Sequence, residues 1–165
     1  MFVLGIDPGL TVTGYGLVQG AHPPQPVAAG VIRTSVEQPI GERLAVLHAH
    51  LCDLIAHHRP DAVAIETVFT NRNLNTAISV GRASGVAILA AAQAGLPVAE
   101  YAPTAIKAAV TGDGTADKKG VAAMVARLLR LEAPPAPADA ADALAVALCH
   151  LRCSPIAARA LGGAR

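Results

Sequence analysis

The chain has 165 residues, of which 53% are hydrophobic and 15% are charged, and its formal net charge is +1. This length fits one ordinary domain with a single core, and the composition excludes a disordered chain. A net charge so close to zero also excludes a strongly basic protein, so contact with a polyanion would need a local cluster of positive side chains.

Targeting signals and cysteine spacing give further expectations. The N-terminus has no basic region before its short apolar stretch, so we expect no secretory signal and a cytoplasmic protein. No apolar run approaches the roughly 18 residues of a membrane span, so we expect no contact with a membrane. Cys52, Cys149 and Cys153 lack C-x-x-C spacing, which predicts reduced, mostly buried thiols instead of a zinc site or a disulfide framework.

The first predicted element is a short buried strand that delivers an acid to a glycine turn. Residues 2–6 are apolar, Asp7 ends the run, and Pro8-Gly9 stops the strand. Residues 13–18 and 27–34 are predicted as two further strands, with a proline-rich loop between them. Three sequential strands predict an antiparallel meander.

The middle of the chain predicts a helix, a strand and a second helix. Residues 41–58 have apolar side chains at helical spacing, and Pro60 stops this helix. Residues 61–66 form an apolar run that ends in Glu66, the pattern of a central strand covered on both faces. A helix is expected from about residue 73 to 94, and a stripe of small residues at four-residue spacing indicates that another helix packs there, from this chain or from a dimer mate. The stripe consists of Ala77, Gly81 and Gly85.

The last part of the chain is expected to alternate between short elements and turns. It predicts a strand at 96–101, helices at 103–110 and about 121–129, and a final helix from about 138 to 152. We expect a single domain over residues 1–153. The tail at 154–165 has little to pack and is expected to fray.

Four acidic residues lie next to apolar segments, where an acid is costly to bury without a partner. Asp7 and Glu66 end two apolar strands, whereas Asp139 and Asp142 begin the last helix at a spacing that puts both carboxylates on one face. If the helix packs its acidic end against the strand ends, the four carboxylates converge and repel one another unless a cation is present. Oxygen ligands without nearby Cys or His favour a hard ion, Mg²⁺ or Mn²⁺.

Each acid also has an ordinary structural interpretation. Asp139 and Asp142 can be first-turn acids that the helix dipole favours by about 0.3 to 1 kcal/mol. Asp7-Pro8-Gly9 can be a simple turn. Glu66 is the hardest of the four to explain in this way.

Two segments could contact nucleic acid. Phe69 lies in a polar loop beside Arg72, and an exposed Phe in such a loop could stack on an unpaired base, although a lone Phe is more often part of a core. All three lysines lie within one thirteen-residue stretch, which makes them candidate phosphate contacts or, more simply, a solvated helix face. The lysines are Lys107, Lys118 and Lys119.

Several short motifs, in their order and spacing, resemble the RuvC family of Holliday-junction resolvases. The motifs are Ile6-Asp7-Pro8-Gly9, Thr13-Gly14-Tyr15-Gly16, Ala64-Ile65-Glu66, Val68-Phe69 and Asp139-Ala140-Ala141-Asp142-Ala143-Leu144. The resemblance covers nearly the whole chain. It implies an α/β protein with the ribonuclease H-like fold, in which a five-stranded mixed sheet is flanked by helices.

The resemblance also implies roles for individual residues. Asp7, Glu66, Asp139 and Asp142 would be the metal-binding catalytic acids of a crossover-junction endodeoxyribonuclease. Lys107 and Lys118 would contact DNA near the cleaved phosphate, with Lys119 as an alternative to Lys118, and Phe69 would stack at the opened crossover beside Arg72.

The implied reaction is two-metal phosphodiester hydrolysis that leaves 5′-phosphate and 3′-hydroxyl ends. A four-way junction offers two equivalent strands, so a two-fold homodimer would supply one active site to each. The helix with Ala77, Gly81 and Gly85 is the expected interface. The family resemblance further implies the branch-migration proteins RuvA and RuvB as partners.

Three alternatives stay open at this point. The opening stretch also resembles the phosphate-binding hairpin of actin-like ATPases and sugar kinases, but those proteins need two such lobes and 165 residues accommodate one. A small ribonuclease H-like nuclease that acts on RNA would have a similar hairpin and similar acids. A junction-binding scaffold without chemistry would require the acids to be structural.

Overall fold

The structure is a computed structural model that describes residues 1–67 and 74–153. Its elements, in chain order, are β1 (Phe2–Asp7), β2 (Val12–Gln19), β3 (Gln25–Arg33), α1 (Ile40–His58), β4 (Ala62–Glu66), α2 (Leu74–Gln93), β5 (Val98–Tyr101), α3 (Pro103–Thr111), α4 (Lys118–Leu128) and α5 (Ala138–Cys153). Phe69, Arg72 and the tail at 154–165 lie outside the described residues.

The strands form one mixed five-stranded sheet in the order β3-β2-β1-β4-β5. Strand β2 pairs antiparallel with both β1 and β3, which confirms the predicted meander. Strand β4 runs parallel to β1 on one side and to β5 on the other. Because β1 and β4 are parallel neighbours, their carboxyl ends lie at the same edge of the sheet.

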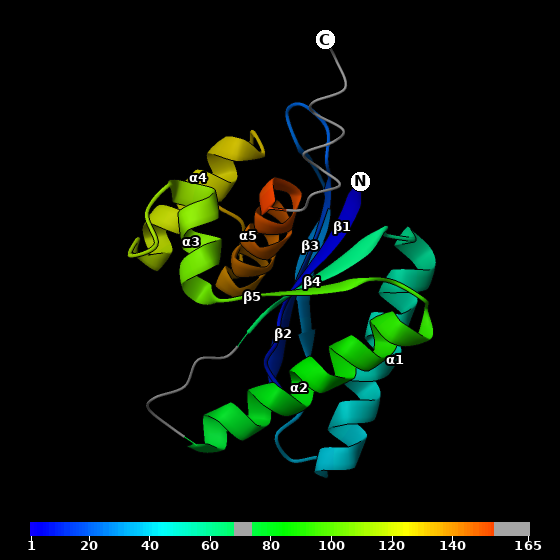
Figure 1. The fold of residues 1–165 in the computed structure, drawn as a ribbon. Coiled ribbons are helices and arrows are strands. Elements are labelled where there is room, and N and C mark those ends of the chain that lie inside the picture. Colours follow the sequence, from blue (N-terminus) through cyan, green and yellow to red (C-terminus); the bar gives the residue numbers. More distant parts are fainter. Residues whose placement is uncertain (68–73, 154–165) are drawn as a thin grey trace.

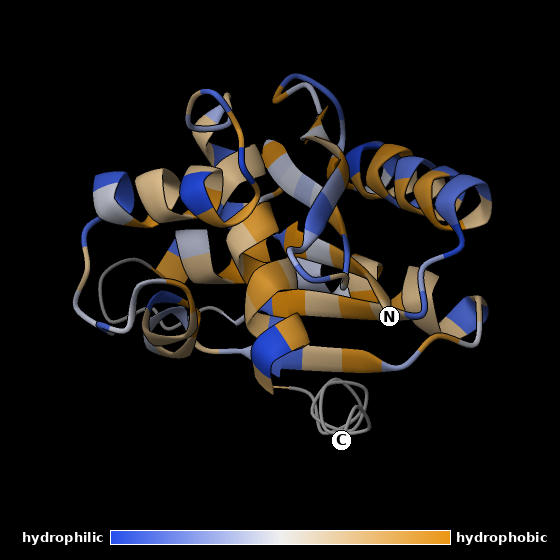
Figure 2. Cartoon of the chain, turned by 90° about the horizontal axis from the view of Figure 1, so that it is seen from above, coloured by the Kyte–Doolittle hydropathy of each residue, from blue (hydrophilic) through white to orange (hydrophobic). Residues whose placement is uncertain are grey.

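Helices cover both faces of the sheet, with α1 and α2 on one face and α3, α4 and α5 on the other (Figure 1). Helix α5 lies directly on β1 and β2, and it is apolar along most of its length (Figure 2). Only a helix that is apolar nearly all round can be enclosed in this way, between a sheet and two further helices. The observed layers confirm the expected five-stranded mixed sheet flanked by helices.

Successive side chains of a strand alternate between the two faces of the sheet, and this alternation decides on which face Asp7 and Glu66 lie. Val3 and Ala64 belong to the core cluster that includes α5. Asp7 and Glu66 are an even number of residues further along the same strands, so their side chains leave the sheet on the α5 face. Two acids that are far apart in the sequence are thereby directed toward the start of one helix.

Two boundaries differ from the sequence-based expectation for physical reasons. Strand β3 begins at Gln25 and includes Pro26, whereas the sequence predicts a strand that begins at residue 27. Because β3 is an edge strand, a residue without an N–H group can be accommodated there. Helix α4 begins at Lys118, three residues before the predicted start, because the Asp117 side chain caps it by accepting a hydrogen bond from Gly120 N at 2.7 Å.

Helix α2 corrects the expectation that no segment is long and apolar enough to span a membrane. Among the described residues it passes that test by length and composition, with a mean hydropathy of 1.3. It contains one charged residue, Arg82, and many Ala and Gly residues, so no contiguous run of large apolar side chains signals it in the sequence. Only 22% of its apolar window is buried, so much of the apolar surface is exposed.

The cysteines also differ in part from the expectation. All three are free thiols, as predicted. Only Cys149 is buried, whereas Cys52 is half-buried and Cys153 is exposed. The expectation of mostly buried thiols was therefore wrong for Cys153, which falls on the last turn of α5, where the helix leaves the core.

Candidate active site

The site is built at the sheet edge where β1 and β4 end. Ile6 pairs with Ile65 in the parallel register, so Asp7 and Glu66 are the next residues on adjacent strands. Their side chains are hydrogen-bonded to each other. Since two ionised carboxylates cannot donate a hydrogen bond, this contact requires one of the two acids to carry a proton.

Glycines in the hairpin allow α5 to approach this edge closely. A Cβ atom on Gly14 would lie 2.0 Å from the backbone oxygen of Asp139, and one on Gly5 would lie 2.2 Å from the backbone oxygen of Ala143. No real side chain tolerates such distances, so only glycine permits this packing. The close approach carries Asp139 and Asp142 to the strand-end acids.

The electrostatics of the site show that the acids act on one another. Burial, together with the charges of Asp7 and Asp142, raises the pKa of Glu66 to about 7. Burial likewise raises the pKa of Asp7 to about 6, with contributions from Asp142 and Asp139, while the Lys118 ammonium acts in the opposite direction. Both carboxyl groups therefore titrate near neutral pH, which is characteristic of functional carboxylates.

Lys118 supplies positive charge to the acids from the first turn of α4. Its Nζ atom lies 2.8 Å from Oδ2 of Asp142, and this hydrogen bond raises the pKa of Lys118. The Lys118 side chain is 80% exposed, whereas that of Asp142 is 18% exposed. A long, mostly solvated side chain can leave this ion pair at small cost.

A pocket of about 270 Å³ lies over the acids. Of the residues singled out in the sequence, five line it: Asp7, Glu66, Lys107, Lys118 and Asp142. Asp139 does not line the pocket, although its charge acts on Asp7. Lys119 is exposed outside the pocket lining.

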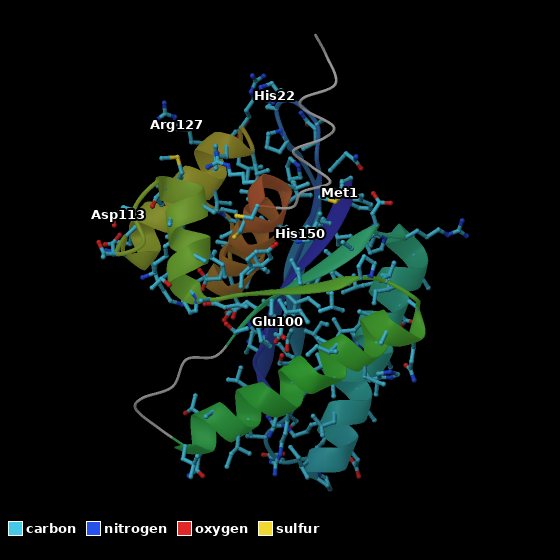
Figure 3. All side chains as sticks on the ribbon, in the orientation of Figure 1. Met1, His22, Glu100, Asp113, Arg127 and His150 are labelled. Carbon is cyan, nitrogen blue, oxygen red and sulfur yellow. The ribbon has the colours of Figure 1, made fainter. Side chains whose placement is uncertain are left out.

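Asp113 serves its own turn and does not line the pocket. Asp113 lies in the turn between α3 and α4, at the outer side of that helix pair, away from the sheet (Figure 3). Its pKa is lowered because its carboxylate accepts hydrogen bonds from the backbone and the hydroxyl of Thr115. Asp113 therefore stabilises its own turn.

The remaining residues singled out in the sequence lie on α2. Gly81 and Gly85 are exposed, and a Cβ atom on either glycine would meet nothing within 4 Å. Ala77 is half-buried one helical turn earlier. Within the described part of the chain, the two glycines are thus not required by any internal packing contact.

The donor set fits a hard divalent cation because it offers carboxylate oxygens only. In residues 1–67 and 74–153, however, no three His, Cys, Asp or Glu side chains stand close enough to hold a metal ion as they are placed. Asp142 is instead paired with Lys118, and Asp7 is hydrogen-bonded to Glu66. A cation bound here would favour the ionised form of both acids and would compete with Lys118 for Asp142.

The pocket also contains residues that the sequence analysis did not single out. Thr67 follows Glu66 directly, and its backbone N–H donates to the Tyr101 carbonyl oxygen at 2.8 Å, which continues the β4–β5 pairing past the acid. Pro103 and Ile106 form an apolar wall from α3. The position of Thr67 after a strand-end acid was a usable signal, whereas nothing local marks Pro103 or Ile106.

Comparison with known proteins identifies the family. The family model described as crossover junction endodeoxyribonuclease RuvC matches residues 3–150. A crossover junction endodeoxyribonuclease RuvC from Halorhodospira halophila is 51% identical over 165 residues, covering 99% of this chain and 98% of the relative. The protein of the same name from Salinispora arenicola is 54% identical over 153 residues, covering 92% of this chain and 87% of the relative.

A solved structure agrees with these sequence matches. T. thermophilus RuvC, in complex with Holliday junction substrate, superimposes with a TM-score of 0.87 at 42% identity, covering 92% of this chain and 93% of that chain. The fold, the extent of the family match and the identity to full-length relatives therefore agree, and the chain belongs to the RuvC family of crossover junction endodeoxyribonucleases.

Proposed function

We propose that this protein resolves four-way DNA junctions by paired hydrolysis of phosphodiester bonds, with Asp7, Glu66, Asp139 and Asp142 as the metal-binding catalytic acids. The observation that carries the proposal is the meeting of Asp7, Glu66 and Asp142 with Lys118 in one pocket. The substrate is inferred from the likeness to T. thermophilus RuvC, a protein solved with a Holliday junction.

The raised pKa values of Asp7 and Glu66 support their role as cation ligands. Buried carboxylates that repel one another release their protons most readily when a divalent cation replaces the missing positive charge. At such a site, two divalent cations supply activation of a water molecule and stabilisation of the charge on the leaving oxygen. We propose two Mg²⁺ ions, with Mn²⁺ as a competent substitute.

The basic residues are proposed as phosphate contacts. Lys107 and Lys118 line the same pocket as the acids, so both can reach a phosphate that lies over Asp7. Lys118 would move from Asp142 to the scissile phosphate, and its exposure supports this exchange. Lys119 and Arg72 are proposed as outer phosphate contacts, and Phe69 as the residue that stacks on an unpaired base at the crossover.

A homodimer is proposed through the exposed face of α2. Leu74 is 75% exposed and Ile78 is 43% exposed, next to the small residues Ala77, Gly81 and Gly85. Large apolar side chains exposed beside a small-residue stripe are suited to helix packing between copies. RuvA and RuvB are proposed as partners from the family resemblance, and the cytoplasm as the location.

The test compares a four-way junction, a linear duplex of the same sequence and an RNA–DNA hybrid, each with Mg²⁺ or EDTA. We expect symmetric nicking of the junction alone, in Mg²⁺ alone. Asp7→Asn should abolish the nicking while leaving junction binding in EDTA intact. Cleavage of the hybrid in preference to the junction would favour the RNA-directed alternative. Loss of junction binding by folded Asp7→Asn protein would make Asp7 a structural acid.

A further inference from the structure

We propose that Arg43 is a positioning residue that fixes the turn carrying Asp7. The inference rests on the metal-binding role proposed for Asp7. It concerns the turn formed by residues 8–11, which joins Asp7 to β2, and the way this turn is attached to the rest of the molecule.

The Arg43 guanidinium connects two threonines at this edge of the sheet. Its Nε atom donates to Oγ1 of Thr34 at 3.0 Å, and its Nη2 atom donates to Oγ1 of Thr11 at 2.9 Å. Oγ1 of Thr34 in turn donates to the carbonyl oxygen of Leu10 at 2.5 Å. One guanidinium thus attaches two successive residues of the turn to α1.

The turn is held by hydrogen bonds within the hairpin and by hydrogen bonds to residues outside it. Within the hairpin, Oγ1 of Thr13 donates to the carbonyl oxygen of Gly9 at 2.6 Å. Outside it, Thr34 N donates to the Thr11 carbonyl oxygen at 3.1 Å. Arg43 adds a link from α1, whose position is fixed independently because Leu47 and Leu51 are buried in the core. The planar fork of Arg suits such a two-hydroxyl bridge, because its donors keep a fixed geometry.

Helix stability does not explain a cation at this place. Arg43 lies at the beginning of α1, where its backbone N–H donates to the Pro39 carbonyl oxygen. The N-terminal end of a helix carries partial positive charge, so a cation there is unfavourable and an acid is favoured. The hydrogen bonds of Arg43 to Thr11 and Thr34 therefore act on residues outside α1.

Removing the guanidinium is expected to loosen the turn without disrupting the core. Thr34 would keep its hydrogen bond to Leu10, whereas the Thr11 hydroxyl would lose its partner in α1. Asp7 would then be held less precisely against Glu66. Loss of groups that orient metal ligands from outside the ligand shell typically costs about 10- to 100-fold in metal affinity.

Arg33 provides a matched control. It ends β3 at the same edge of the sheet and is exposed, and its side chain makes no hydrogen bond to the described residues. Arg33→Ala therefore removes the same charge without touching the turn. Thr11→Val is a second variant that removes only the acceptor on the turn and keeps the β-branched shape.

The experiment measures Mn²⁺ binding by calorimetry on the full chain without DNA, together with hydrogen exchange of the amides at residues 9–11. We expect Arg43→Ala to weaken Mn²⁺ binding about tenfold and to speed exchange of the turn amides, with Thr11→Val showing a smaller change in the same direction. Arg33→Ala should match the wild type. Arg43→Lys should restore part of the affinity, because an ammonium can reach one of the two hydroxyls.

Unchanged Mn²⁺ affinity in folded Arg43→Ala and Thr11→Val proteins would overturn the inference. So would unchanged metal affinity combined with weaker junction binding in EDTA and a smaller salt dependence, which would make Arg43 a phosphate contact. Failure of the proposed function is distinguishable, because wild type and Asp7→Asn would then bind Mn²⁺ equally. That result would remove the premise of the inference as well.

Discussion

Asp7 and Glu66 are acids whose surroundings oppose their ionisation. Burial is the largest cause that raises the pKa of Asp7 to about 6 and that of Glu66 to about 7, and the negative charge of Asp142 adds to the rise at both acids. The folded protein thus holds protons that the unfolded chain releases near pH 4. Between about pH 4 and 7 the folded state binds more protons, so these acids contribute stability at low pH that is lost as the pH rises.

The first prediction concerns this loss of stability with rising pH. Without divalent cations, Asp7→Asn should be more stable than the wild type at pH 8, by about 1 to 2 kcal/mol, with a smaller gain at pH 5. Thermal unfolding in EDTA at both pH values measures this. The comparison uses the difference between variant and wild type, because burial lowers the pKa of His150, which acts on the stability of the wild type in the opposite direction.

Asp113→Asn is the control for this prediction. The pKa of Asp113 is lowered by hydrogen bonds from Thr115, so its ionised form is the one that the fold favours. Its replacement should therefore lower stability at pH 8, opposite in sign to Asp7→Asn. A stabilisation by Asp7→Asn that is equal at pH 5 and pH 8 would contradict the assignment of a raised pKa to this acid.

The second prediction separates two adjacent lysines. Lys118→Ala should change stability by less than about 1 kcal/mol, because the ion pair with Asp142 is largely solvated on the lysine side. Cleavage in Mg²⁺ should nevertheless fall about 100-fold, because the variant loses the cation that we propose as a contact of the reacting phosphate. Single-turnover cleavage and thermal unfolding measure the two effects.

Lys119→Ala removes an equal charge from the same helical turn, outside the pocket lining. It should lower junction affinity slightly and leave the single-turnover rate near that of the wild type. Equal losses of the single-turnover cleavage rate in the two variants would indicate that both lysines act only through general electrostatic attraction of DNA. A reduced salt dependence of junction binding in either variant reports a lost phosphate contact.

At the scale of elements, the site depends on how closely α5 lies on the hairpin. Gly5 and Gly14 remove the side chains that would otherwise separate the helix from β1 and β2. The acid at the start of α5 is therefore positioned by residues that carry no functional group. The candidate site in this chain therefore depends on small residues along the first two strands.

The third prediction tests that contact. Gly14→Ala places a Cβ atom 2.0 Å from the Asp139 backbone oxygen, so the start of α5 must move. We expect a loss of about 1 to 3 kcal/mol in the free energy of unfolding, together with loss of most cleavage activity. Denaturant unfolding and junction cleavage measure the two effects.

Gly41→Ala is the matched control, because a Cβ atom there meets nothing within 4 Å and the residue lies in α1. It should be neutral or stabilising by up to about 1 kcal/mol, as expected for Gly to Ala in a helix. Full activity in Gly14→Ala would show that the acid at the start of α5 does not need this packing.

For the whole molecule, α2 presents an apolar surface that is exposed among residues 1–67 and 74–153. Leu74 and Leu89, at opposite ends of the helix, are 75% and 50% exposed, and the helix meets the length and hydropathy criteria of a membrane span. Its buried side, with Ala83 and Ala87, packs in the core cluster that includes α1. The exposed side is the surface through which we propose that two copies associate.

The fourth prediction concerns this association. Gly81→Glu adds a charge at a position where a Cβ atom meets no described residue within 4 Å, so the fold should be retained or stabilised by up to about 1 kcal/mol. The proposed dimer should dissociate, and paired nicking of a junction should be lost. Sedimentation velocity and the ratio of doubly to singly nicked junctions measure both effects.

Val27→Glu is the control, because Val27 is 51% exposed on the edge strand β3, away from α2. It should leave the association state unchanged. A Gly81→Glu protein that sediments like the wild type would place the interface elsewhere.

Local sequence patterns were sufficient to predict the elements and the acids that end them. Periodicity, prolines and glycines are short-range signals, so the strands ending in Asp7 and Glu66 and the helix beginning near Asp139 could be located from the sequence. The resemblance to a known family then indicated the fold and the activity, and the comparisons confirm both.

Tertiary structure alone decided which of these groups meet. Two of these features are contacts between segments far apart in sequence: Lys118 pairs with Asp142, and Arg43 attaches the turn that follows Asp7. A third is the apolar face of α2, which is exposed among the described residues. The pKa shifts of Asp7 and Glu66 also depend on burial and on neighbouring charges, which no local pattern records. The sequence by itself therefore determined which groups are present and at which ends of which elements, and packing determined their distances and charges.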